Sequence, residues 1–244
     1  MKIKNLLLTA LLITSISSLG QSNFKTNSDF GLAFSPGSQE FNVALSWKQI
    51  HSVKPDSKFK VGYGLRFNLY TGTDKEYITA PAELTSGKTG PGVFFSENII
   101  ENLDTFLVGS AQHNSLNATI YLEYDFTEKW GIGFNIDAAG LAFGKETSGV
   151  INSLDGNNLT VVGENASPTK GNLLLISDND IGMLNSELYV TYNVNKRLAI
   201  NAGFTFLFTE YTTTNPITIN QNNDRFRHKT LLGLISINYK PFNK

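Results

Sequence analysis

Residues 120–136 read IYLEYDFTEKWGIGFNI and residues 188–204 read LYVTYNVNKRLAINAGF, so this chain contains one pattern twice. In each copy, a run of alternating apolar and polar residues leads into a short polar segment and then into a second alternating run. Because successive side chains of a strand point to opposite faces, Ile120 and Leu122 share one face and Tyr121 takes the other. Each copy therefore predicts a β-hairpin with one apolar face and one more polar face.

The same alternation occurs in four other parts of the chain and predicts eight strands in all. It is clearest from Phe59 to Leu69, where apolar residues alternate almost without a break with Lys60, Arg66, Asn68 and glycines. The predicted strands span 29–35, 40–50, 58–70, 115–126, 130–144, 183–194, 198–211 and 229–240.

Short turns and long connections alternate between these strands, apart from a short first connection on the long-loop side. The long connections are 71–113, 145–181 and 212–228. Because consecutive strands run antiparallel, all three must leave the same end of the sheet. Membrane barrels have this asymmetry, with short periplasmic turns, longer extracellular loops and an even number of strands. The pattern predicts an all-β fold, an eight-stranded antiparallel up-and-down transmembrane β-barrel whose short turns are periplasmic.

The N-terminus predicts export from the cytoplasm. Lys2 and Lys4 precede an apolar run at 6–16, and small residues follow, as in a secretory signal peptide. The run is too short to cross a bilayer, which takes about 20 residues. We therefore expect a signal peptide at 1–20 and an outer-membrane barrel domain at 21–244, in contact with the outer-membrane lipid.

Composition and motifs exclude several classes of site. The chain has no cysteine, hence no disulfide framework and no thiolate metal site, and its formal charge of −1 gives no reason to expect a nucleic-acid surface. His113-Asn114-Ser115 resembles the His-x-Ser pair of outer-membrane phospholipases, but Leu116-Asn117 does not continue that motif. We expect no enzyme activity, no catalytic residues, no cofactor and no metal site.

Charged residues on the polar faces point into the predicted barrel. The interior of an eight-stranded barrel is just wide enough for side chains, and an unpaired buried charge costs several kcal/mol. We predict an ion network that plugs the lumen, in which Arg66 pairs with Glu123, Asp137 or Glu187 from other strands. The alternative is that these side chains line a narrow path for a solute.

The two tryptophans lie near the short turns. Trp47 ends the second predicted strand and Trp130 begins the fifth, and both fall on the outward face. They are the predicted interface anchors, because tryptophan prefers the boundary between lipid and water.

The long connections carry patterns of their own. A helical stripe predicts a short amphipathic helix at 97–108, which could cap the barrel mouth, lie on the outer leaflet or meet a partner. Residues 155–158 read DGNN between two apolar runs and predict a hairpin above the membrane. An extracellular or envelope protein partner would bind through 71–113 and 145–181.

The signal peptide, the strand pattern and the final strand from Leu231 to Tyr239, followed by KPF at 240–242, resemble the small eight-stranded outer-membrane barrels of Gram-negative bacteria. These barrels are related in shape to the membrane domain of outer-membrane protein A. The resemblance covers the whole chain after the signal peptide. It implies a terminal strand that the insertion machinery reads through its last aromatic residue, although here two further residues follow that aromatic.

Several functions fit this fold. The first is a non-enzymatic barrel with a structural or interaction role and a plugged lumen. The alternative is a narrow transport barrel for small hydrophobic or other small solutes. A third, weaker alternative is a component of a secretion system.

Overall fold

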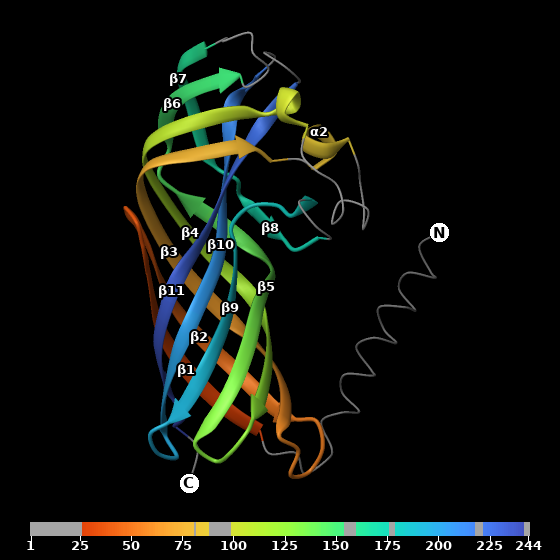
Figure 1. Cartoon of the computed structure of the whole chain (residues 1–244), viewed down its shortest axis with the longest axis vertical. Helices are drawn as coiled ribbons and strands as arrows, with labels where there is room; N and C mark the ends of the chain where they lie inside the picture. The colour runs from red at the N-terminus through yellow and green to blue at the C-terminus, as the bar shows by residue number, and fades with distance from the viewer. Residues whose placement is uncertain are drawn as a thin grey trace, which may run out of the picture.

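The computed structural model describes residues 26–80, 82–87, 99–153, 160–175, 179–217 and 222–241. These residues form eleven strands in one sheet, with a short helix α2 (Ala82–Ser86) and a 3₁₀ turn η3 (Ile100–Asn102) (Figure 1). None of the helices in these ranges is long and apolar enough to cross a membrane. The strands are β1 Thr26–Gly37, β2 Glu40–Ser52, β3 Phe59–Thr79, β4 Asp104–Asp125, β5 Trp130–Gly144, β6 Thr147–Ser153, β7 Thr160–Pro168, β8 Gly171–Leu173, β9 Leu184–Asn193, β10 Leu198–Ile217 and β11 Asn223–Tyr239.

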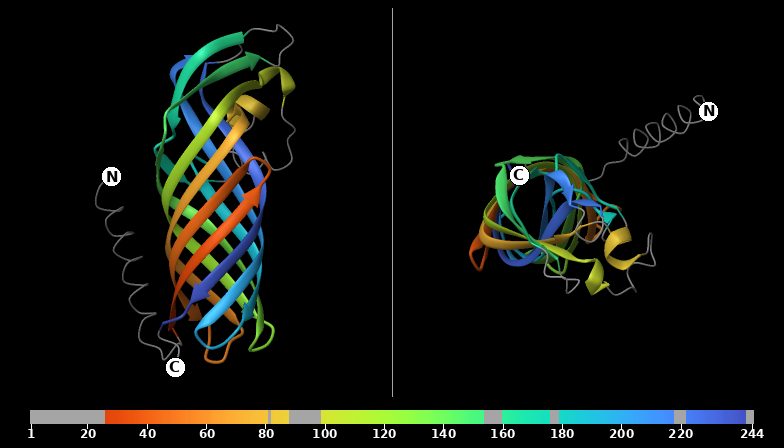
Figure 2. Two further views of the ribbon diagram at one scale, coloured as in Figure 1. Left: turned by 90° about the vertical axis from the view of Figure 1, so that its left-hand side faces the viewer. Right: turned by 90° about the horizontal axis from the view of Figure 1, so that it is seen from above.

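The strand pairings lead around a common axis and return to their starting strand (Figure 2). The order is β1, β2, β3, β4, β5, β9, β10, β11 and again β1, and every neighbouring pair is antiparallel. In this circuit Phe30 of β1 lies opposite Trp47 on one side and Tyr239 on the other. We call these eight strands the lower ring, because they occupy the lower part of Figure 1.

A second circuit of pairings continues above the first. Beyond the end of the β1–β2 hairpin, β11 pairs directly with β3, with Phe226 opposite Thr79. The hairpin of β6 and β7 lies between β4 and β10, since β6 pairs with β4 and β7 pairs with β10. The circuit of β3, β4, β6, β7, β10 and β11 is named the upper ring.

The structure confirms the all-β, antiparallel part of the sequence prediction, and each of the eight predicted strands overlaps an observed one. The sheet contains eleven strands rather than eight because the long connections themselves form strands. Much of 71–113, expected to be a loop, is strand: β3 runs on to Thr79 and β4 begins at Asp104. The hairpin expected in 145–181 is confirmed, with Ile151 opposite Val161, while its turn at 155–158 lies outside the described residues.

The helix expected at 97–108 is wrong. Residues 97 and 98 lie outside the described residues, η3 makes a single turn, and the chain is strand from Asp104. The physical reason is that Phe106 and Val108 face the core of the upper ring while Leu107 is 42% exposed. This alternation has a period of two residues and therefore suits a strand, and pairing with β3 and β6 supplies the backbone hydrogen bonds.

The outer surface of the lower ring is apolar. We call it the apolar belt, and every strand of the ring contributes exposed large side chains to it. Its members include Phe30, Leu32, Leu45, Tyr63, Leu65, Leu116, Ile120, Ile132, Phe134, Leu188, Val190, Ile200, Phe204, Ile235 and Ile237.

Inside the lower ring, the side chain of Tyr189 packs directly against the backbone of β5, and this contact requires a glycine at position 133. The ring of Tyr189 lies over it, and a β-carbon built at Gly133 would be 2.4 Å from Tyr189 Cε2. We expect Gly133→Val to lower the free energy of unfolding by about 1–3 kcal/mol, measured by urea titration in detergent micelles. Gly109→Val is the control, because a β-carbon there meets nothing within 4 Å. Equal losses from both variants would contradict the proposed packing.

Candidate functional site: the polar lumen

The inward faces of β3, β4, β5 and β9 build a polar layer across the lower ring. Their side chains alternate with the apolar belt, so each belt residue places its neighbour in the lumen. Arg66 comes from β3, Asp137 and Asn135 from β5, and Asn185 and Glu187 from β9, and all five are buried. We call this group the arginine layer.

Arg66 is held by partners on all three guanidinium nitrogens. Nε donates to Asp137 Oδ1 at 3.0 Å, and Nη2 lies 2.7 Å from the same oxygen. Nη1 donates to Asn135 Oδ1 at 2.6 Å and lies 3.2 Å from Glu187 Oε2. Nη2 also donates to the backbone carbonyl of Asn185. The charge is therefore both paired and hydrogen-bonded, which burial requires.

Asp137 accepts further hydrogen bonds from neutral groups. Asn117 Nδ2 donates at 2.7 Å, Thr119 Oγ1 at 2.8 Å and the backbone N–H of Asn185 at 3.1 Å. Sequence reasoning brought Arg66, Asp137 and Glu187 together but missed the asparagines. The sequence indicates only that these asparagines stand at inward positions of alternating strands. Because their amide groups are neutral, they do not need a charged partner, and so their contacts could not be predicted from charge pairing.

Glu123 does not belong to the arginine layer, which corrects the prediction of one network. Its Oε1 accepts a hydrogen bond from Lys48 Nζ at 2.6 Å, and Lys48 also lies 3.8 Å from Asp29. Lys60 pairs with Asp125 nearer the short turns. We call these five residues the lysine layer. The lumen thus holds two separate ionic layers.

Little space remains between the layers. Two cavities of about 20 Å³ each lie in the lumen, one beside Arg66 and Tyr121 and one beside Asp29 and Lys60. A cavity of this size holds about one water molecule. Side chains therefore fill the lower ring.

An apolar core fills the interior of the upper ring, as the ionic layers fill that of the lower ring. Tyr70, Tyr77, Phe106, Tyr211 and Phe226 are buried there in one cluster. The interior of the strands therefore changes from ionic to aromatic where the lower ring meets the upper ring.

His113 is buried among these rings. Its Nε2 lies 3.2 Å from the Tyr77 hydroxyl, 4.3 Å separates its ring centroid from that of Tyr211, and Nδ1 has no hydrogen-bond partner in the part of the chain that the structure describes. Burial, with a smaller contribution from His228, lowers the pKa of His113 from 6.5 to about 3. The imidazole is therefore neutral in the folded state near pH 7.

We expect acid to destabilise the upper ring through His113. As the pH falls below about 6.5, the unfolded chain binds a proton that the folded chain excludes, so stability is lost progressively down to about pH 3. Burial would raise the pKa of Glu40, but hydrogen bonds from His228, Tyr70 and Thr230 outweigh it and lower that pKa from 4.5 to about 2. Glu40 therefore adds a loss only below about pH 4.5.

Thermal melting between pH 6.5 and 5, followed by near-ultraviolet circular dichroism in detergent, isolates the contribution of His113. The His113→Gln variant should show a flatter pH dependence in this window than the parent, whatever its absolute stability. An unchanged slope would show that another group titrates.

The remaining predicted residues are placed as follows. Trp47 lies opposite Phe30 and Leu65, and Trp130 is 49% exposed with its ring 4.8 Å from that of Tyr192, both on the outward face. Their role as interface anchors stays a prediction. Ser115 Oγ accepts hydrogen bonds from Asn68 and Asn117, so the partners of this hydroxyl group are amides of the polar interior and not the imidazole of His113.

Within the described ranges, no group of three or more acidic or histidine residues could hold a metal ion.

No protein-family model matches the chain, and no curated protein matches it significantly. Among solved structures, the chain is similar to Neisserial surface protein A, with a TM-score of 0.37, 10% identity, and coverage of 90% of this chain and 97% of that one. It is also similar to the toluene transporter TodX of Pseudomonas putida (TM-score 0.26, 10% identity, 93% and 74% covered). A FadL homologue of Pseudomonas aeruginosa has a TM-score of 0.23 and 13% identity, with 82% and 68% covered. At such scores the likeness carries no argument about function.

Proposed function

We propose that this chain is a non-enzymatic integral protein of the outer membrane with a structural or interaction role, and that the eight strands of the lower ring cross the bilayer. The observation that carries the proposal is the polarity of that ring. Its outer surface is the apolar belt, and its interior holds the fully buried pair of Arg66 and Asp137. A soluble sheet buries its apolar face, whereas a membrane barrel exposes that face to lipid.

The proposed orientation follows from the two ends of the molecule. A signal peptide at 1–20 would deliver the chain to the envelope, and the short turns would face the periplasm. Trp130, the first residue of β5, would then lie toward the periplasmic interface of the membrane, whereas Trp47, opposite Leu65, would lie deeper in the apolar belt. The upper ring would stand outside the cell.

An interaction role is supported by the outer wall of the upper ring. Leu107, Val150 and Val162 lie opposite one another on β4, β6 and β7, and Val162 is 77% exposed. This row lies on the upper ring, beyond the apolar belt, where an apolar surface marks a contact site. We propose an extracellular or envelope protein as its partner.

A plugged lumen argues against the transport alternative. A solute would have to pass the lysine layer, the arginine layer and the aromatic core in turn. A component of a secretion system could have either an open or a plugged lumen, so the filled interior does not bear on that alternative. No other observation favours it.

Reconstitution into a planar bilayer tests the proposal. We expect a protein that changes mobility on boiling in a detergent gel and that gives no single-channel current. Stepwise openings would favour transport over the plugged barrel. Recovery of the protein as a detergent-free monomer would overturn the membrane location itself.

A further inference from the structure

The two small cavities of the lower ring are neighbours in the lumen. Each has a volume of about 20 Å³, and Lys48, Asn201 and Asn238 line both of them. The first cavity also reaches Arg66, and the second also reaches Asp29. The cavities therefore form a row that leads from the lysine layer to the arginine layer.

Three buried polar atoms in the linings of these cavities have no hydrogen-bond partner within the described part of the chain. They are the hydroxyl oxygen of Tyr121, Asn201 Oδ1 and Asp29 Oδ1. Tyr121 lines the first cavity, Asp29 lines the second, and Asn201 lines both. Buried polar groups are almost always hydrogen-bonded, and ordered water serves where protein groups do not reach. Each cavity thus presents polar atoms that a small bound molecule would satisfy.

The charged groups beside these atoms are already paired. Lys48 Nζ lies 2.6 Å from Glu123 Oε1 and 3.8 Å from Asp29 Oδ2, and Arg66 Nη2 lies 2.7 Å from Asp137 Oδ1. The second cavity is lined by three basic and three acidic side chains, those of Lys48, Lys60, Lys240, Asp29, Glu123 and Asp125. A bound ion would add an uncompensated charge there, and the volume admits about one water molecule. The chemistry therefore fits a neutral hydrogen-bond donor of the size of water.

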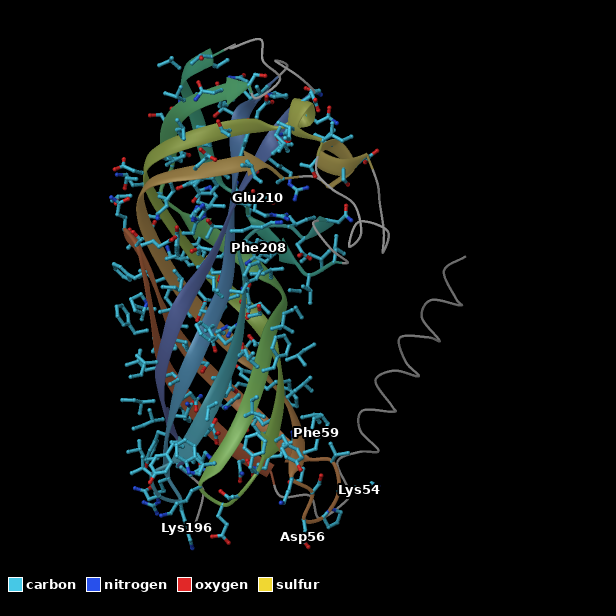
Figure 3. The ribbon with its side chains drawn as sticks, viewed as in Figure 1. Lys54, Asp56, Phe59, Lys196, Phe208 and Glu210 are labelled. Atoms are coloured by element: carbon cyan, nitrogen blue, oxygen red, sulfur yellow. The ribbon has the colours of Figure 1, made fainter. Side chains whose placement is uncertain are left out.

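Solvent reaches this row from the short-turn end only. The ion pair of Lys60 and Asp125 borders the second cavity, and 19% and 33% of these two side chains are exposed. Figure 3 shows Phe59, the residue before Lys60, at the short-turn end of the molecule. At the other end of the row, Arg66 and Asp137 are fully buried. The row is therefore open toward the lysine layer and closed at the arginine layer.

We propose that each cavity binds one water molecule, and that the two waters hydrate the plug from the short-turn end. The inference rests on the plugged lumen of the proposed function. One water bonds to the Tyr121 hydroxyl and donates to Asn201 Oδ1, and the other donates to Asn201 Oδ1 and Asp29 Oδ1. The row ends at Arg66, whose guanidinium nitrogens are all bonded, so it opens no path for ions.

Radiolytic hydroxyl labelling of the full mature chain in detergent, read by mass spectrometry, tests these sites. Radicals that form from a bound water modify the side chain beside it, even where bulk solvent does not reach. Mixing with oxygen-18 water before irradiation shows whether the bound water exchanges. We expect Tyr121 to be labelled although it is buried, whereas Tyr77 and Tyr211 in the apolar core of the upper ring should stay unlabelled.

Asn201→Leu removes the acceptor that both cavities share and keeps the size of the side chain. This variant should lose most of the labelling at Tyr121. Thr205→Val is the matched control, because Thr205 is another buried polar residue of β10 that bonds to Ser35 at 2.7 Å and lines neither cavity. It should label Tyr121 as the parent does.

The parent protein alone decides the question if Asn201→Leu does not fold. Labelling of Tyr121 no stronger than that of Tyr77 in the parent would overturn the inference, as would unchanged labelling in a folded Asn201→Leu protein. Such a result in a chain that inserts and is electrically silent overturns this inference alone. Stepwise currents from the parent would instead overturn the plugged barrel of the proposed function.

Discussion

Replacing Arg66 by alanine should lower the free energy of unfolding by about 3–5 kcal/mol, because the carboxylates of Asp137 and Glu187 would lose their buried cation. Urea titration in detergent micelles, followed by the mobility shift of the folded protein, measures the loss. Lys196→Ala is the control, since Lys196 lies in an exposed turn and its removal should change stability by no more than about 0.5 kcal/mol.

The double variant Arg66→Met with Asp137→Asn should recover much of that loss. Removing both charges leaves no unpaired ion between these two positions, so the effects of the two single changes should not add. Additive effects would contradict the coupling of Arg66 to Asp137. We also expect the Arg66→Ala protein to remain electrically silent, because the aromatic core of the upper ring still closes the axis.

Leu65→Arg should lower the free energy of unfolding by a comparable amount, but by adding a charge to an apolar surface and not by removing one from the interior. Leu65 is 49% exposed in the apolar belt, opposite Trp47 and Ala118. An arginine facing lipid near the bilayer midplane costs about 2–4 kcal/mol in a membrane barrel. The same urea titration in lipid vesicles measures the cost.

Glu76→Arg is the matched control for this experiment. Glu76 is an exposed position of β3 beyond the belt, so the same arginine there should face water and change stability by at most about 0.5 kcal/mol. If Leu65→Arg were as mild as Glu76→Arg, the belt would not contact lipid. Gly64 is not a suitable inward comparison, because a β-carbon there would lie 2.1 Å from the carbonyl oxygen of Trp47.

The strands of the lower ring were predictable because an apolar outer surface and a polar interior place opposite chemistry on alternate residues. Phe59 to Leu69 shows that period almost without interruption, and β3 follows it. The continuation of β3 to Thr79 was not predictable in the same way. Beyond the belt the strand faces water outside and an aromatic core inside, so polar residues such as Thr73 and Glu76 occur on the face that is apolar lower down.

The sequence predicts which charged residues lie in the lumen, but only partly which of them pair with one another. Alternation placed Arg66, Asp137 and Glu187 in the lumen, and the structure brings them together. Glu123 shares their face but lies nearer the short turns, where Lys48 reaches it. Counting residues from the turns already separates it from the others, because Glu123 lies close to the end of β4 at Asp125 whereas Arg66, Asp137 and Glu187 lie further along their strands.

Four strands, β3, β4, β10 and β11, belong to both rings and run without interruption from one to the other. If the lower ring spans the outer membrane as proposed, a force applied outside the cell would reach the bilayer along continuous backbone. Hydrogen bonds between such strands would be loaded in shear, all together, rather than opened one after another. In that orientation the upper ring would transmit force directly to the membrane-spanning strands, which would suit it to hold an attached partner under tension.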